Sequence, residues 1–185
     1  MDGLGRRDRI RYDTPKFAGF GITSSHGNSD ARDVALRYGS ELGSVKIKAA
    51  VAWSDANLTE TVNGSLSILL PVGLSFTIAG GQRDREDLLS IGRGSEDANF
   101  QYAKIGYKFT AMELGQTRLF ASYGQFNDLR ASGEQSATIA AGVVQLVEPL
   151  GIELQAGYAR FSLEQPGLAD PDDIDVITLG ARVKF

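Results

Sequence analysis

Basic residues recur at every second position in several short stretches of this chain. Arg9 and Arg11 stand two positions apart, as do Lys46 and Lys48. In an extended strand such residues project from the same face, and a face with several cations attracts anions. The chemistry expected of these residues is therefore electrostatic recognition of anions. The charged residues predicted to share one face are Arg9, Arg11, Asp13, Arg37, Lys46, Lys48, Lys104, Lys108, Arg182 and Lys184.

Catalysis and metal binding have little support in the residues. The sole histidine, His26, follows Ser24 and Ser25, but adjacency in the sequence does not supply the geometry of a catalytic triad. The acidic stretch 170–175 lacks the glycine-centred spacing of a calcium loop, and the absence of Cys excludes disulfides and thiolate metal sites. We expect no enzymatic activity, no cofactor and no metal site.

The charged positions sit in segments where apolar and other residues alternate with the period of a β-strand. The last segment, IDVITLGARVKF, is typical: Ile177, Leu179 and Ala181 lie on one side and Thr178 and Arg182 on the other. Eleven such strands are predicted, and together they indicate an all-β chain. They cover residues 9–13, 17–25, 34–40, 44–54, 60–70, 74–81, 100–110, 116–126, 136–147, 152–158 and 174–185.

Connections between these strands alternate in length. Those near residues 15, 42, 72, 113 and 149 are short, whereas those near 29, 57, 90, 131 and 168 are polar and mostly longer. Strands of about nine to eleven residues suffice to cross a bilayer at a tilt. Short turns at one rim and long loops at the other are typical of an outer-membrane barrel, and a soluble sandwich has shorter strands. We therefore predict an antiparallel transmembrane β-barrel, an up-and-down meander.

Whole-chain properties agree with this prediction. The chain has 185 residues, a mean hydropathy of −0.14 and a net charge of −4. Near-neutral hydropathy is expected when lipid-facing and water-facing residues alternate, and the acidic balance disfavours nucleic-acid binding. On the apolar side, aromatic rings near strand ends are predicted to form a girdle at the membrane boundary. These residues are Tyr12, Tyr38, Trp53, Tyr107, Phe109, Tyr123, Tyr158 and Phe185.

The end of the chain resembles the terminal signal of bacterial outer-membrane β-barrels. It has a polar residue at Thr178, glycine at Gly180, a hydrophobic residue at Val183 and an aromatic residue at Phe185. In that family this signature is read by the barrel assembly machinery. The resemblance implies the bacterial outer membrane as the location. The start, MDGLGRRDRI, lacks the layout of a secretory signal, so we expect a processed chain or a fragment.

A second resemblance covers nearly the whole chain. The stretches RRDRIRYDTPKFAGFGITSSHG, FQYAKIGYKF and LGARVKF are similar to general diffusion porins of Gram-negative bacteria. The resemblance implies a water-filled channel for passive diffusion of ions and small hydrophilic solutes, assembled as a homotrimer in the lipid bilayer. It also makes Arg9 and Arg11 the best candidates for the pore constriction. The other charged residues of their face would line the pore.

The chain departs from that family in length. Porins of this type have sixteen strands, so residues 1–185 are expected to form one barrel domain that lacks the N-terminal strands and the constriction loop. Eleven antiparallel strands cannot close by pairing first with last. Either ten of them close into a small barrel, or the sheet stays open. The functional alternative is a small barrel that acts as an adhesin or structural anchor through its outer loops, with 82–99 as a recognition loop. Lipopolysaccharide is a further expected partner, whereas the acidic stretch 170–175 is expected to be a solvated loop rather than a divalent-ion bridge to it.

Overall fold

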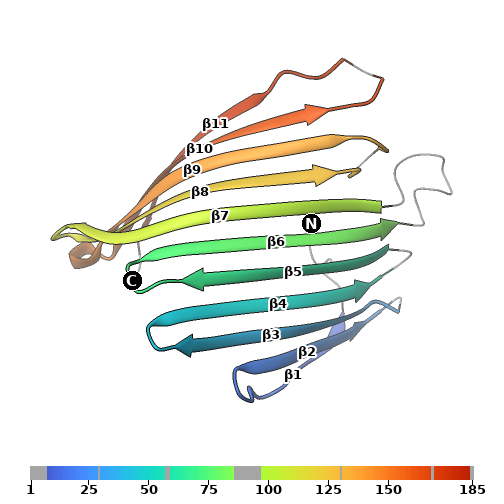
Figure 1. Cartoon of the computed structure of the whole chain (residues 1–185), viewed down its shortest axis with the longest axis horizontal. Coiled ribbons are helices and arrows are strands. Elements are labelled where there is room, and N and C mark those ends of the chain that lie inside the picture. The colour runs from blue at the N-terminus through green and yellow to red at the C-terminus, as the bar shows by residue number, and fades with distance from the viewer. Residues whose placement is uncertain are drawn as a thin grey trace.

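The chain forms one antiparallel meander of eleven strands (Figure 1). The computed structural model describes residues 8–28, 30–56, 59–85, 97–129, 131–167 and 169–183. Each strand pairs with its neighbours in sequence, as predicted for an all-β up-and-down sheet. The strands are β1 (Arg9–Asp13), β2 (Phe20–Gly27), β3 (Arg32–Leu42), β4 (Val45–Asp55), β5 (Thr59–Leu69), β6 (Leu74–Arg85), β7 (Asp97–Met112), β8 (Gly115–Asn127), β9 (Gln135–Val147), β10 (Ile152–Glu164) and β11 (Ile174–Val183).

The sheet is open along two edges. Among the described residues β1 pairs only with β2 and β11 only with β10, so the first and last strands do not meet. A closed ten-stranded barrel, one of the two alternatives that the strand count left, is therefore not what this chain forms. The reason is that β1 is itself part of the sheet: it pairs with β2 over Arg9–Asp13, so β2 has no free edge for β11, and eleven strands leave the two edge strands parallel to each other.

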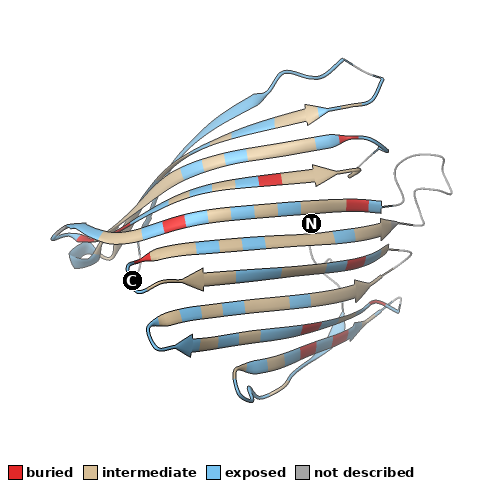
Figure 2. Ribbon diagram, viewed as in Figure 1, coloured by how far each residue is buried: buried red, intermediate tan, exposed pale blue. Residues whose placement is uncertain are grey.

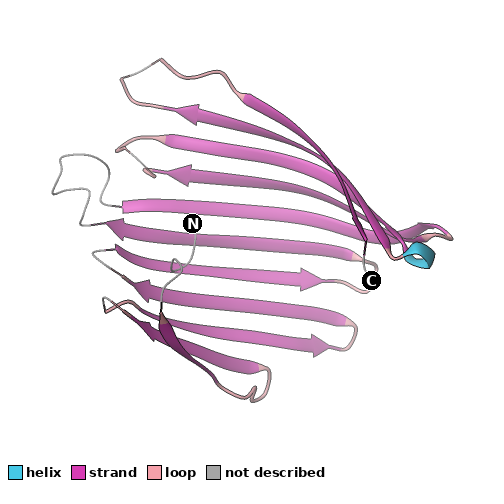
Figure 3. Cartoon of the chain, turned by 180° about the vertical axis from the view of Figure 1, so that it is seen from behind, coloured by secondary structure: helices cyan, strands magenta, loops and turns pink. Residues whose placement is uncertain are grey.

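The two rims of the sheet differ as expected (Figure 3). One rim carries the tight connections, among them the turn at Gly43 and the short 3-10 helix Glu148–Leu150 before β10. The other rim carries the connections after β2, β4, β6, β8 and β10. We call these the turn rim and the loop rim. No helix among the described residues has the length and apolar character to cross a membrane.

Strand boundaries differ from the prediction mainly at the loop rim. β6 extends to Arg85 and β7 begins at Asp97, so the polar stretch expected to be one long loop is partly strand; residues 86–96 lie outside the described part. These strand ends are polar, so the apolar alternation that located the strands was lost there. At the turn rim, Phe17 is excluded from β2 because Ala18 and Gly19 adopt positive φ, which forms a tight turn closed by a bridge between Phe17 and Phe20.

Cross-strand register assigns every strand residue to one of two faces, because directly paired residues project to the same side. Arg11 pairs with Ser25, which pairs with Asp33 on β3. Arg37 lies on the same face of β3, four residues after Asp33, and pairs with Ala50 on β4. Continuing in this way assigns one face of the whole sheet. We call this side the charged face. The opposite side, which we call the apolar face, carries every exposed large hydrophobic residue of strands β1–β9. Examples are Ile22, Val51, Ile78, Ile105 and Ile139.

The described residues contain no conventional hydrophobic core (Figure 2). The buried hydrophobic residues are only Ala31, Ala35 and Ala98, and no large side chain is fully buried. Ile177 and Leu179 are each 78% exposed. A water-soluble protein of this size would bury such side chains. The apolar face therefore needs a hydrocarbon solvent, as a transmembrane barrel provides.

The turn between β5 and β6 is packed tightly against β7. Gly73 has φ of +89° and its carbonyl accepts a hydrogen bond of 3.0 Å from the backbone N–H of Lys108. A β-carbon built at Gly73 would lie 2.1 Å from the Lys108 carbonyl oxygen. Gly43, in the turn between β3 and β4, has a similar φ of +62° but open space around it.

We predict that Gly73→Ala destabilises the folded chain far more than Gly43→Ala. The left-handed backbone alone costs about 1 kcal/mol at Gly43, and overlap with the β7 backbone raises the cost at Gly73 to about 3 kcal/mol or more. Urea unfolding in detergent micelles, followed by fluorescence of the single residue Trp53, measures both values. Equal losses for the two variants would contradict the packing described for Gly73.

Candidate functional site: a charged wall

The residues predicted to share a charged face are brought together by the sheet. β1, β3 and β4 contribute the first six, β7 contributes Lys104 and Lys108, and β11 contributes Arg182. Lys184 lies outside the described residues. The register places all nine described members on the charged face. That this face lines a pore stays a prediction at this point. The nine are Arg9, Arg11, Asp13, Arg37, Lys46, Lys48, Lys104, Lys108 and Arg182.

The four carboxylates that the strands place on this face are all neutralised by neighbouring cations. Their ion pairs are Arg9–Asp33 at 3.8 Å, Arg11–Asp13 at 2.7 Å, Lys46–Glu41 at 3.0 Å and Arg182–Glu153 at 2.8 Å. These pairs contribute little net charge. The anion attraction expected of the face must therefore come from its other cations.

Asp13 is the most heavily bonded of these carboxylates. It accepts two hydrogen bonds from the guanidinium of Arg11, at 2.8 and 2.7 Å, and one of 2.7 Å from the hydroxyl of Thr23 on β2. The same Thr23 oxygen accepts a hydrogen bond from Nη1 of Arg37. Arg11, one of the two constriction candidates, is thus held by a carboxylate, whereas Arg37 is oriented by a neutral hydroxyl and keeps its full charge.

Arg37 faces a cavity of about 690 Å³ on the charged face of β1–β5. Lys16 in the connection after β1 and Lys48 on β4 also line it, together with the Arg11–Asp13 pair and the serine hydroxyls of β5. Lys16 was not among the predicted residues, because it lies in a turn and outside any alternating pattern. The lining of the cavity carries four cations, Arg11, Lys16, Arg37 and Lys48, and one carboxylate, Asp13.

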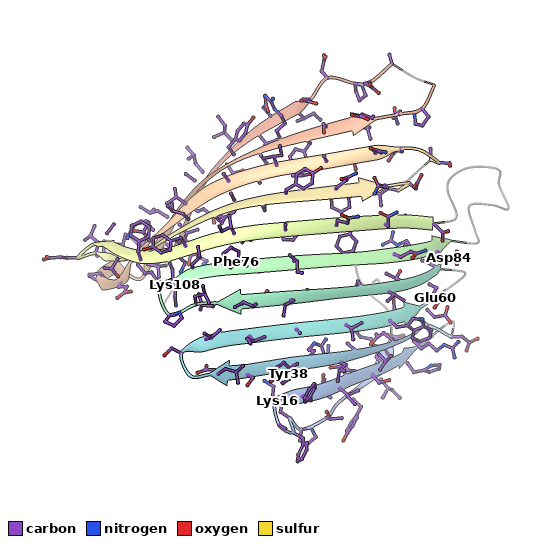
Figure 4. The ribbon with its side chains drawn as sticks, viewed as in Figure 1. Lys16, Tyr38, Glu60, Phe76, Asp84 and Lys108 are labelled. Atoms are coloured by element: carbon purple, nitrogen blue, oxygen red, sulfur yellow. The ribbon has the colours of Figure 1, made fainter. Side chains whose placement is uncertain are left out.

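Two further strands add cations without counter-charges. Lys104 and Lys108 on β7 and Arg118 on β8 form no ion pair in the part of the chain that the structure describes. Arg118 was not singled out in the sequence, although the alternation of β8 places it on the same side as Ser122. Figure 4 shows Lys108 toward the turn rim, with Glu60 and Asp84 at the loop rim.

The predicted aromatic girdle lies on the apolar face. Register places all seven described members there, and Phe185 lies outside the described residues. Tyr38 packs on Phe20 with ring centroids 4.6 Å apart, and Tyr107 stacks on Phe109 at 5.1 Å. A position at the membrane boundary stays a prediction. The seven are Tyr12, Tyr38, Trp53, Tyr107, Phe109, Tyr123 and Tyr158.

A belt of polar side chains crosses the apolar face at its loop-rim end; we call it the outer collar. Arg32 contacts Asp55 at 2.9 Å and lies 5.4 Å from the Trp53 ring, whose Nε1 donates to Glu60 at 2.6 Å. Further hydrogen bonds join collar residues of neighbouring strands. Sequence analysis missed this belt because it interrupts the alternation. The collar comprises Arg32, Asp55, Glu60, Gln82, Asp97, Asn99, Gln125, Asn127, Arg160 and Asp175.

Ser25 and His26 of β2 do not form a catalytic pair. Register puts Ser25 on the charged face, where its hydroxyl donates to Asp33, and puts His26 on the apolar face opposite Ile10 and Arg32. The geometry of a nucleophile with its base is therefore absent at these residues.

The residues of the terminal signature lie on both faces of β11. Thr178 pairs with Gly157, Gly180 pairs with Gln155, and Val183 pairs with Ile152 on the apolar side. A β-carbon at Gly180 would lie 2.6 Å from Nε2 of Gln155, so glycine makes room for that side chain. Recognition by the assembly machinery stays a prediction, and Phe185 is outside the described part.

A long antiparallel meander with one apolar and one charged face is the strand arrangement of outer-membrane β-barrel proteins. Comparison with known families agrees: the family described as Gram-negative porin matches residues 2–183, so the chain belongs to the Gram-negative porin family. Among solved structures, the anion-selective porin from Comamonas acidovorans has the same fold, with a TM-score of 0.63 and 15% identity. The alignment covers 96% of this chain and 59% of that one. A search of curated proteins finds no match.

The two faces can be distinguished chemically, because the chain has no native cysteine. Ser67→Cys and Ser122→Cys place a thiol on the charged face, whereas Leu66→Cys and Ala121→Cys place one at the same depth on the apolar face. In liposomes we expect a charged thiol reagent to modify the first two at least about tenfold faster, because thiolates do not form in hydrocarbon. Equal rates at all four positions would contradict the assignment of the faces.

Proposed function

We propose that the charged face is part of the wall of a water-filled channel in the outer membrane. The channel passes ions and small hydrophilic solutes by passive diffusion and favours anions. Membership of the Gram-negative porin family supports the channel. The observation that carries the anion preference is the imbalance on the charged face, where the carboxylates are paired and several cations are not.

Solvation supports placing this face toward water. Guanidinium and ammonium groups cost several kcal/mol each in hydrocarbon, and the register puts them opposite the exposed aliphatic residues. In the wall of a membrane pore, one face of a sheet contacts channel water and the other contacts hydrocarbon. Arg37 and Lys48 are the strongest candidates for setting selectivity, because both line the large cavity and neither is paired with a carboxylate. The similar fold of an anion-selective porin is in keeping with this preference.

The conducting form must contain more strands than these eleven. Backbone groups along the edges of β1 and β11 would be unsatisfied in a bilayer, so further strands have to pair with them. In keeping with the family resemblance, we propose that the complete barrel forms a homotrimer, is inserted by the barrel assembly machinery and contacts lipopolysaccharide at its loop rim. The adhesin or anchor alternative receives no support from the comparisons.

Ion selectivity tests this function. In planar bilayers under a KCl gradient, the reversal potential of the wild-type protein should indicate preference for chloride. Removing two free cations with Arg37→Gln and Lys48→Gln should lower the chloride-to-potassium permeability ratio by about twofold or more, because local potential sets the ion concentration at the wall.

The matched control removes two cations from the outer collar instead, with Arg32→Gln and Arg160→Gln. This pair changes the formal charge equally but lies on the apolar face, so the permeability ratio should stay near the wild-type value. A cation-selective wild-type channel, or an equal response of the two double variants, would refute the assignment of selectivity to the charged face. A complete barrel, with further strands paired to β1 and β11, that inserts but conducts no current would refute the channel itself.

A further inference from the structure

A second cavity on the charged face lies far from the constriction candidates, at the turn rim between β5 and β9. Its volume is about 390 Å³. Lys104 and Lys108 of β7 and Arg118 of β8 line it, and none of its lining residues is acidic. Lys108 and Arg118 are directly opposite each other, and Lys104 lies four residues before Lys108 on the same face of β7; we call these three residues the cation cluster.

The register places two of these cations where their positive charges repel each other. Lys108 and Arg118 are directly paired across β7 and β8 on the same face. Like charges at such positions destabilise a sheet, and no carboxylate of the described residues forms an ion pair with either side chain. Among the described residues, the only polar partner of the Arg118 side chain is Gln116, whose side-chain oxygen accepts a hydrogen bond of 2.8 Å from Nε. A bound anion would relieve this repulsion.

The rest of the cavity is apolar. Leu69, Phe120 and Val144 line it beside the cations. Phe120 breaks the alternation of β8 by projecting to the charged face, where Nζ of Lys104 lies 4.6 Å from its ring centroid. A β-carbon at Gly142 would lie 2.7 Å from Cε1 of Phe120, so the glycine allows the ring to lie against the β9 backbone. The ring is thereby held as a floor next to the cation cluster.

The apolar surface continues beyond this floor. On the charged face of β9 and β10, the residues following Val144 toward the loop rim are small or apolar, including Ala140 and Ala159. A strongly hydrated inorganic anion gains nothing from such a surface. An anion with an apolar body would place its charge between Lys108 and Arg118 and its body on Phe120.

We propose that this cavity binds small organic anions with an apolar body, such as aromatic or short aliphatic monocarboxylates, at the turn-rim mouth of the channel. The inference rests on the proposed function in one respect, since it takes the charged face to be in contact with water. This site concentrates amphipathic anions at one mouth of the channel, whereas the Arg37 cavity on β1–β5 attracts anions of any kind by its charge.

Binding is measured on the full chain in nonionic detergent at low ionic strength, with 4-fluorobenzoate as the probe and ¹⁹F line broadening as the readout. We expect Lys108→Gln with Arg118→Gln to weaken the affinity for 4-fluorobenzoate about tenfold, because two charge-assisted contacts are lost. Phe120→Ala should lower the affinity for 4-fluorobenzoate several-fold. The affinity for acetate, which is weak in the wild type, should not change.

Lys46→Gln is the matched control. Lys46 also lies near the turn rim of the charged face, but it is paired with Glu41, so its loss should barely change the affinity. Equal weakening by Lys46→Gln would show that binding follows overall charge and would overturn the site. Acetate competing as well as benzoate would overturn the apolar component, and absence of 4-fluorobenzoate binding by the folded wild-type chain would overturn the proposal entirely.

Stability gives an independent readout. Without ligand, Lys108→Gln should make the chain slightly more resistant to urea, because it removes a like-charge pair; a lysine with a structural role would lower the resistance. Conductance separates the two proposals. A complete barrel that conducts but does not bind 4-fluorobenzoate refutes this site alone, whereas a complete barrel that binds the probe but never conducts refutes the channel and leaves the site standing.

Discussion

The structure depends on one constraint: in hydrocarbon, each backbone N–H and C=O must find its partner within the protein. The meander meets it for every interior strand, since each pairs on both sides. Pairing also sets the register, and the register alone sorts side chains into two faces. A shift by one residue between two strands would move arginine and lysine side chains into lipid and isoleucine into water. One strand register therefore satisfies the backbone hydrogen bonds, separates lipid-facing from water-facing side chains and places the charges.

The lack of a core follows from the same constraint. Soluble domains bury their large aliphatic side chains against one another, whereas here the largest ones remain exposed along the apolar face. Stability has to come from the ladder, from cross-strand contacts such as Phe20 with Tyr38, and from the bilayer. Polar cross-strand links on the charged face, for example Asp13 with Thr23, add specificity to the register and also decide which cations remain free to act on solutes.

Much of the fold was predictable because alternation is a local property. A period of two located most of the strands and predicted the sidedness of Arg9, Lys48 and Lys104, and the alternation of short and long connections predicted their order. Local alternation could not show which cations are neutralised, since Arg9 meets Asp33 and Arg182 meets Glu153 only after folding. It also missed Arg118, whose importance comes from its position opposite Lys108. Phe120 is an aromatic residue at a charged-face position of β8, which the alternation does not explain. The structure explains it by the contact with Lys104 and by the space that Gly142 leaves for the ring.

The length of the strands relative to the bilayer has a further consequence. β7 has 16 residues and so is about 50 Å long, more than a tilted crossing of the hydrocarbon requires. Beyond Tyr107 it continues past β6 at the turn rim, and at the loop rim the outer collar replaces aliphatic side chains with amides and carboxylates. The aliphatic portion of each strand thereby anchors the protein in lipid, and the collar portion contacts the aqueous medium. The collar portions can therefore change in length or composition without disturbing the depth at which the aliphatic band holds the protein.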